Sequence, residues 1–260
     1  MRLDQYIVNS GLQQSRERAK REILAGQVLV NGQVVTSPAH KVNGDEIIAF
    51  GENVLKYVSR GALKLEKALN VFDVNMRDRV VLDIGSSTGG FTEVSLINGA
   101  SKVIALDVGT KALHEKLRLD SRVIVMENTD FRKVEASKIN DVNLIVTDVS
   151  FISLRHIFPK IKEVFGDEIE IVALFKPQFE CGEKLAKKYK GVIKDKVVHI
   201  NLLNDFSEYI GALGYKISNV NYSPITGKEG NIEYLFHING NNEIKPNYSQ
   251  LVNNAFSSIN

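Results

Sequence analysis

The stretch VVLDIGSSTGGF (residues 80–91) combines a strand, a glycine-rich turn and the start of a helix. VVLDI is a near-continuous apolar run that contains Asp83, and the glycines after it let the backbone turn tightly and approach a ligand. A helix beginning at the turn offers free backbone amides. The spacing is GxxxGG rather than GxGxxG, so the dinucleotide fingerprint of nicotinamide dehydrogenases is not met. The stretch indicates an α/β fold with a ligand at the carboxyl end of its strand.

Strands and helices alternate on both sides of this stretch. Apolar runs predict strands at 80–84, 102–107, 122–126, 143–148, 170–175, 215–222 and 232–238. Helices are predicted at 62–72, 90–99, 111–118, 154–165 and 193–213. The alternation predicts a mostly parallel sheet covered on both faces. Because only the turn SPITGKEGN separates the last two strands, the final strand is expected to be antiparallel.

The first fifty residues have the pattern of a small α+β domain. Two helices are expected in LDQYIVNSGL and SRERAKREILAG, the second with Ser15 as its N-cap. VLVNGQVV contains Asn31-Gly32, the strongest short hairpin signal, and DEIIAF supplies a third strand. The predicted organisation is a domain at 1–50, a polar linker at 51–60, an α/β domain at 61–240 and a tail at 241–260 that can end in a short helix.

Composition narrows the class of protein. With 260 residues, 43% hydrophobic and 25% charged, the chain suits one large domain and one small one. A net charge of +2 means that a nucleic-acid partner needs local basic patches. The single Cys181 excludes a disulfide framework, and five histidines without ligand spacing predict no metal. No apolar window is long enough to span a membrane and no secretory signal opens the sequence, so we expect a cytoplasmic protein.

The glycine-rich turn predicts the cofactor. With Asp83 before it, the turn resembles the S-adenosylmethionine loop of class I methyltransferases, where the aspartate can hold the amino-acid end of the cofactor. Asp107 ends the next strand and is placed to accept hydrogen bonds from both ribose hydroxyls. Asp130 either contacts the adenine amino group or is a surface loop aspartate. The predicted cofactor contacts are Asp83, Gly85, Ser86, Ser87, Thr88, Gly89, Gly90, Phe91, Asp107, Val108, Asp130 and Phe131.

Four charged residues at element ends form the candidate catalytic set: Lys64, Asp148, Lys176 and Glu233. A hydroxyl attacks a methyl donor only once its proton leaves, and a lysine can take that proton when burial or nearby positive charge disfavours its ammonium form. Lys176 is the expected base, Asp148 orients it, Lys64 adds the second cation, and Glu233 positions Lys64 or accepts from the hydroxyl. The alternatives are a solvated helix face for Lys64, a structural strand cap for Lys176 and a water-facing position for Glu233.

Basic residues near the N-terminus predict an RNA contact. Arg16 and Lys20 share a helix face by their i, i+4 spacing and would grip a phosphate backbone with strongly salt-dependent affinity. A basic solvated helix is the alternative. The predicted RNA-binding residues are Arg2, Ser15, Arg16, Arg18, Lys20 and Arg60.

The motifs taken together resemble a known family. RLDQYIVNSGLQQSRERAKREILAGQVLVNGQVVTSP (2–38) resembles the S4 type of RNA-binding module. Followed in order by SRGALKLEKAL, LDIGSSTGGFT, DVSFISL, FKPQFE and EGNIEYLFH, it resembles the TlyA family, rRNA ribose methyltransferases that also carry a haemolysin label. The α/β part is similar to FtsJ-like RNA ribose methyltransferases, whose lysine-aspartate-lysine-glutamate tetrad falls on the four candidate catalytic residues.

The resemblance implies a function. It implies S-adenosylmethionine-dependent 2′-O-methylation of a cytidine in ribosomal RNA within a ribosomal subunit. Because the sequence begins almost at the RNA-binding module, it is similar to the shorter members, which implies large-subunit rRNA as the target. Two other classes stay open: a membrane-acting haemolysin, which predicts a strongly apolar segment, and a ribosome factor that binds RNA without catalysis.

Overall fold

The computed structural model describes residues 1–13, 15–50, 57–227, 229–240 and 242–258. Contacts between Cα atoms divide the chain into an N-terminal unit, Met1–Arg60, and a C-terminal unit, Gly61–Asn260. Residues 51–56 of the predicted linker lie outside the described part of the chain, and residues 57–60 group with the N-terminal unit.

The N-terminal unit packs two helices on a small antiparallel sheet. Its elements are α1 (Leu3–Asn9), α2 (Arg16–Leu24), β1 (Val28–Val30), β2 (Gln33–Val34) and β3 (Ile48–Phe50), with strand order β2-β1-β3. Asn31 and Gly32 both have positive φ, 50° and 78°, as a tight two-residue hairpin turn requires. Leu3, Ile7 and Ile23 are fully buried and form its core with neighbouring apolar residues.

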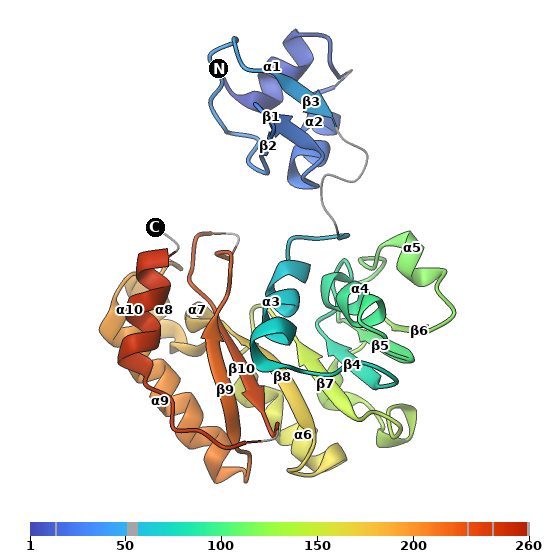
Figure 1. The fold of residues 1–260 in the computed structure, drawn as a ribbon, viewed down its shortest axis with the longest axis vertical. Helices are drawn as coiled ribbons and strands as arrows, with labels where there is room; N and C mark the ends of the chain where they lie inside the picture. The colour runs from blue at the N-terminus through green and yellow to red at the C-terminus, as the bar shows by residue number, and fades with distance from the viewer. Residues whose placement is uncertain (14, 51–56, 228, 241, 259–260) are drawn as a thin grey trace. The chain divides into compact units, whose positions relative to one another are not determined.

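A seven-stranded sheet runs through the C-terminal unit (Figure 1). Its order is β6-β5-β4-β7-β8-β10-β9; β10 pairs antiparallel with β8 and β9, and the pairs from β6 to β8 are parallel. The strands are β4 (Val80–Ile84), β5 (Lys102–Leu106), β6 (Val123–Met126), β7 (Leu144–Thr147), β8 (Glu170–Phe175), β9 (Ile217–Tyr222) and β10 (Tyr234–Ile238). This confirms the predicted mostly parallel sheet with an antiparallel last strand. β9 and β10 pair antiparallel at one end of the sheet, with β10 between β8 and β9.

Helices cover both faces of this sheet (Figure 1), and its central strands are buried along nearly their whole length, as their continuous apolar runs predict. The α-helices are α3 (Ala62–Phe72), α4 (Gly90–Ile97), α5 (Glu115–Arg118), α6 (Phe158–Phe165), α7 (Pro177–Glu180), α8 (Gly182–Lys188), α9 (Lys196–Ala212) and α10 (Tyr248–Ser258). Short 3-10 turns lie at Phe131–Lys133, Ala136–Lys138 and Leu154–His156.

The sequence placed most elements well but missed two helices. α3 matches its predicted bounds, and α10 forms in the polar tail. α7 and α8 were not predicted, because they are too short to show a helical repeat of apolar residues. The predicted helix at 111–118 shortens to α5, because Lys111 has positive φ, 54°, and His114 has extended backbone and caps the helix by accepting the Lys116 N–H.

Candidate active site

The four candidate catalytic side chains meet at the carboxyl end of the parallel strands. Lys64 lies in α3, Asp148 follows β7, Lys176 follows β8 and Glu233 precedes β10. Lys176 Nζ lies 2.5 Å from Asp148 Oδ1, and Lys64 Nζ lies 3.9 Å from Asp148 Oδ2 and 2.6 Å from Glu233 Oε2. The side chains therefore form one chain of alternating charge.

Strand register explains how residues far apart in sequence arrive together. β10 pairs Tyr234 with Phe175, so Glu233 and Lys176 are the next residues at the same end of the two strands. β4 pairs Ile84 with Thr147, which brings Gly85 beside Asp148. α3 packs against β8 and β10, and this packing brings Lys64 to the other three charged side chains.

Burial makes these contacts strong. Lys64 is 7% exposed, Lys176 6% and Glu233 2%. Buried charges are tolerated only when paired, and here each has an oppositely charged partner. The solvated-face alternative for Lys64 and the water-facing alternative for Glu233 are therefore wrong. The Lys176–Asp148 contact is a close ion pair rather than a well-directed hydrogen bond.

Two further polar side chains join the set, and the sequence had not singled them out. Lys176 Nζ donates a 2.8 Å hydrogen bond to Ser150 Oγ, and Gln178 Nε2 donates to Glu233 Oε1 over 3.5 Å. The Gln178 Oε1 atom is buried without a hydrogen-bond partner among the described residues. The sequence could have indicated both residues by their positions: Ser150 lies two residues after Asp148, and Gln178 lies two residues after Lys176.

An exposed aromatic residue stands beside the charges. Phe151 is 91% exposed and adopts positive φ, 63°, which is uncommon for a large side chain. Its ring centroid lies 5.2 Å from that of Phe179 in α7. Both a solvent-exposed ring and the backbone strain at Phe151 are costly to folding, and such costs are typical of functional loops.

The glycine-rich turn lies against the same strand end. Gly85 has φ 85°, and a Cβ atom there would lie 3.1 Å from the Asp148 carbonyl oxygen. Gly89 has φ 97°, and a Cβ atom there would collide with Leu117. Gly90 then begins α4, while the neighbouring Phe91 ring is buried. Only glycine fits both turn positions, so the backbone of the turn stays open to a ligand.

Asp83 and Ser86 supply unpaired polar atoms beneath this turn. Asp83 is fully buried; Thr92 Oγ1 donates to its Oδ2 over 2.6 Å, and its Oδ1 has no partner among the described residues. Burial, reinforced by the negative charges of Asp148 and Asp107, raises the pKa of Asp83 to about 7. Ser86 Oγ is likewise buried without a described partner. A cationic ligand group at Asp83 would favour its ionised form, so these atoms fit the ammonium-bearing end of S-adenosylmethionine.

Asp107 completes the predicted cofactor contacts around the turn. Its carboxylate accepts backbone N–H groups from Ser87 at 2.8 Å and Gly109 at 2.7 Å, which fixes its orientation. The Thr88 carbonyl accepts from the His114 N–H, and Val108 is 70% exposed beside Asp107. A carboxylate held this way retains lone pairs for ribose hydroxyls.

The third predicted cofactor segment is less suited to its expected role. Asp130 forms an ion pair with Arg132, with Oδ2 2.7 Å from Nη2, and this hydrogen-bonded guanidinium lowers the pKa of Asp130. The Phe131 side chain is 2% exposed and packs in the core. Contact of Phe131 with the cofactor stays a prediction.

In the N-terminal unit, most of the predicted RNA-binding residues also make polar contacts within the unit. Asp4 is fully buried, and its carboxylate forms ion pairs with Arg2 and Arg16, each with Nε at 2.9 Å. Ser15 Oγ accepts the Arg18 N–H and caps α2. Arg18 pairs with Glu22 at 3.1 Å, Arg60 donates to Thr36 at 3.4 Å, and Lys20 is exposed.

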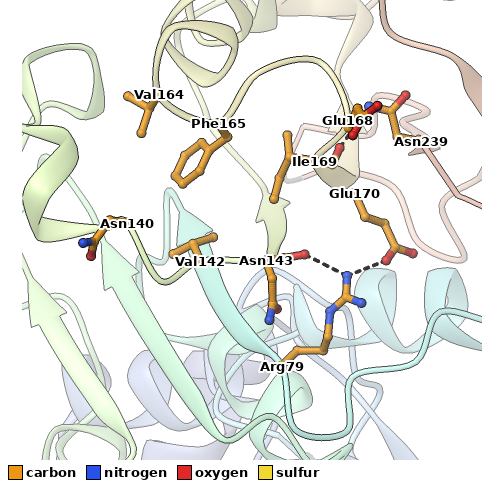
Figure 2. Close-up of a pocket in the computed structure, with 10 residues that line it drawn as sticks. All are labelled: Arg79, Asn140, Val142, Asn143, Val164, Phe165, Glu168, Ile169, Glu170 and Asn239. Carbon is orange, nitrogen blue, oxygen red and sulfur yellow. Dashed lines mark hydrogen bonds and ion pairs between the residues drawn. The ribbon is translucent and has the colours of Figure 1, made fainter.

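A separate depression of about 570 Å³ lies at the amino end of the sheet (Figure 2). Arg79 reaches across it to the Asn143 carbonyl and to the carboxylate of Glu170, whose Oε1 also contacts His237 Nε2 at 2.9 Å. Burial raises the pKa of Glu170, but the hydrogen bond from His237 and the charge of Arg79 outweigh it and leave the pKa lowered. These contacts tie strand starts together, away from the catalytic charges.

Comparison with known proteins places this geometry in a family. The FtsJ-like methyltransferase model matches residues 57–240, and the S4 domain model matches residues 1–48. None of the described helices has both the length and the apolar character needed to cross a membrane.

Relatives match over most of the chain. Hemolysin A of Brachyspira hyodysenteriae is 44% identical, covering 91% of this chain and 99% of the relative. The 23S rRNA (cytidine-2′-O)-methyltransferase TlyA of Campylobacter jejuni is 37% identical, covering 91% and 98%. A solved structure described as a hemolysin from Streptococcus thermophilus has a TM-score of 0.76 at 37% identity, covering 99% of this chain and 96% of that one. The chain therefore belongs to the TlyA family of FtsJ-like methyltransferases and carries an N-terminal S4 domain.

Proposed function

We propose that this protein transfers a methyl group from S-adenosylmethionine to the 2′-hydroxyl of a cytidine ribose in ribosomal RNA. The observation that carries the proposal is the chain of ion pairs Lys176–Asp148–Lys64–Glu233, with both lysines and Glu233 buried, beside an open glycine-rich turn. A site for methylating a base carbon would instead need a nucleophilic cysteine, and Cys181 lies outside this set of contacts.

The roles of the four residues follow from their contacts. A lysine accepts a proton only as the neutral amine, and its side chain must lie within hydrogen-bond reach of the hydroxyl. Lys176 is held by Asp148 and Ser150 at the strand end, so its Nζ is the candidate acceptor of the ribose proton. Lys64, held by Glu233, supplies a fixed positive charge for the oxygen as it loses that proton. Bound S-adenosylmethionine supplies the electrophilic methyl carbon.

Asp83, Ser86 and Asp107 are the residues that would hold the cofactor. Asp83 and Ser86 offer buried oxygens without described partners, and Asp107 offers an oriented carboxylate. The glycines at 85 and 89 leave the backbone open between them.

Phe151 is placed to position the target nucleotide. Its exposed ring lies three residues after Asp148, and aromatic side chains commonly stack on unpaired RNA bases. A base stacked there must leave its helix, since the ring needs a base face that neighbouring bases do not cover. An RNA complex with the target base still stacked in its helix would contradict this role.

The large ribosomal subunit is the proposed substrate. The Campylobacter relative is named for 23S rRNA, whereas a 38% identical Mycobacterium tuberculosis relative is named for both 16S and 23S rRNA. The S4 domain supports recognition of structured RNA, and we infer that it docks on the subunit while the C-terminal unit modifies the nucleotide.

The test is to incubate the protein with labelled S-adenosylmethionine and each purified ribosomal subunit, then map the modification. We expect one 2′-O-methylated cytidine in large-subunit rRNA. Label on a base atom, or no label on either subunit, would overturn the proposal. Leakage of liposomes without methyl donor would instead support the haemolysin class.

A further inference from the structure

A lysine-rich segment of the C-terminal unit has no role in the site described above. Residues 182–196, GEKLAKKYKGVIKDK, contain six lysines and two acids and comprise α8, the following turn and the start of α9. The lysines are Lys184, Lys187, Lys188, Lys190, Lys194 and Lys196, and all six are exposed.

Repulsion between neighbouring lysines destabilises α8. Lys184 lies three and four residues before Lys187 and Lys188, so the three share one face of α8. Like charges at this spacing destabilise a helix. Glu183 offers Lys187 one ion pair at 3.4 Å, but both side chains are more than 80% exposed and such a pair compensates little.

Buried polar residues fix this segment beside the catalytic charges. Asn231 is 2% exposed; its Nδ2 donates to the Gly191 carbonyl at 2.7 Å, and its Oδ1 accepts the Ile193 N–H at 3.1 Å. The fully buried His199 contacts the Ile193 carbonyl at 3.0 Å and the Tyr234 hydroxyl at 2.7 Å. Asn231 and Tyr234 flank Glu233 closely in sequence, so the turn between Lys190 and Lys194 is fastened to the segment that carries a catalytic residue.

The segment also begins at the catalytic strand. α7 starts directly after Lys176, and α8 follows it, at the end of the sheet where β8 finishes (Figure 1). Exposed cations thus continue outward from the reacting charges on the same unit, with no contribution from the N-terminal unit.

We propose that residues 182–196 form a second RNA-binding surface, which holds the phosphates of the strand flanking the target nucleotide. This inference rests on the proposed function. Lysine ammonium groups bind phosphate as point charges and require no base sequence, so this surface would hold the RNA in place while other contacts choose the nucleotide. The S4 domain and this surface then engage different parts of one RNA.

The experiment compares two triple variants of the full chain. K187Q/K188Q/K190Q removes three charges from the proposed surface. K138Q/K216Q/K245Q removes three exposed lysines from elsewhere on the same unit and has the same net charge. Circular dichroism confirms that both variants fold. Affinity for large-subunit rRNA is measured from low to high salt without S-adenosylmethionine, and kcat and KM are measured separately.

We expect the first variant to bind RNA roughly tenfold more weakly and its log–log salt slope to fall by about 2, since each lost phosphate contact removes about 0.7. Its KM for RNA rises while kcat stays within about twofold, because the tetrad is untouched. The control variant matches the unaltered protein. Equal behaviour of the two variants would overturn the proposal.

The design separates this inference from the proposed function. If the unaltered protein binds RNA but methylates none, the proposed function fails while the binding comparison still decides the surface. Sedimentation with phosphatidylserine vesicles tests whether the lysines bind an anionic membrane instead of RNA. Vesicle binding lost only in the first variant, with RNA affinity unchanged, would assign the lysines to a membrane surface and contradict an RNA role.

Discussion

Individual residues in this protein are constrained by their charged neighbours. Lys64 and Glu233 are both nearly buried and lie 2.6 Å apart. Removing Glu233 leaves Lys64 with only the longer 3.9 Å contact to Asp148. Removing one partner of such a pair costs about 3–5 kcal/mol. This local dependence gives a direct prediction.

Glu233→Gln should lower the free energy of unfolding by about 3 kcal/mol, because Lys64 keeps its charge and loses its closest counter-charge. Urea unfolding measures the change. Glu183→Gln is the matched control, since it breaks the exposed Lys187 pair and should leave stability unaltered. A Glu233 variant as stable as the control would show that the buried pair is not held as described.

Asp83 should make stability depend on pH. Its pKa is about 7 in the folded chain and near 3.8 in the unfolded one. Between these values the folded protein retains a proton that the unfolded chain has released, so stability without cofactor falls as pH rises from about 4 to 7. Asp83→Asn should flatten that fall, as judged from urea midpoints at each pH. An identical fall in the variant would place its origin elsewhere.

At the scale of elements, the glycine-rich turn depends on how closely β4 and β7 approach. Gly85→Ala adds a methyl group 3.1 Å from the Asp148 carbonyl oxygen, on top of the strain of positive φ. Gly166 also has positive φ, 76°, with open space around it, so Gly166→Ala suffers only backbone strain of about 1–3 kcal/mol. We expect calorimetry to show cofactor binding lost in the first variant and retained in the second.

Element prediction from sequence was limited by what periodicity can show. The long buried strands and α3 have clear patterns of apolar residues. The four candidate catalytic residues and the residues of the glycine-rich turn were identified from sequence motifs. The short helices α7 and α8 left no repeat, and the partners Ser150 and Gln178 were found only through strand register and packing.

At the scale of the whole molecule, basic residues on two units are expected to share one RNA. Arg16 serves the N-terminal unit's own fold through Asp4, whereas Lys20 is exposed on the same helix. Lys20→Ala should therefore reduce the salt slope of RNA binding by about 0.7–0.9 without destabilising the unit. Arg16→Ala should reduce stability as well, because Asp4 stays buried with one fewer partner. Filter binding and thermal unfolding distinguish the two, and an unchanged slope in Lys20→Ala would remove this residue from the RNA contact.

The account depends most on Lys176 as the proton acceptor, and single-turnover methyl transfer tests it directly. Lys176→Ala and Lys176→Arg are compared with the unaltered protein on large-subunit rRNA, with RNA affinity measured in parallel. The arginine variant keeps a positive charge beside Asp148 but cannot release its proton. The account predicts that both variants bind RNA normally and lose about 10²–10⁴-fold in rate. An arginine variant that transfers methyl groups at nearly the original rate would contradict it.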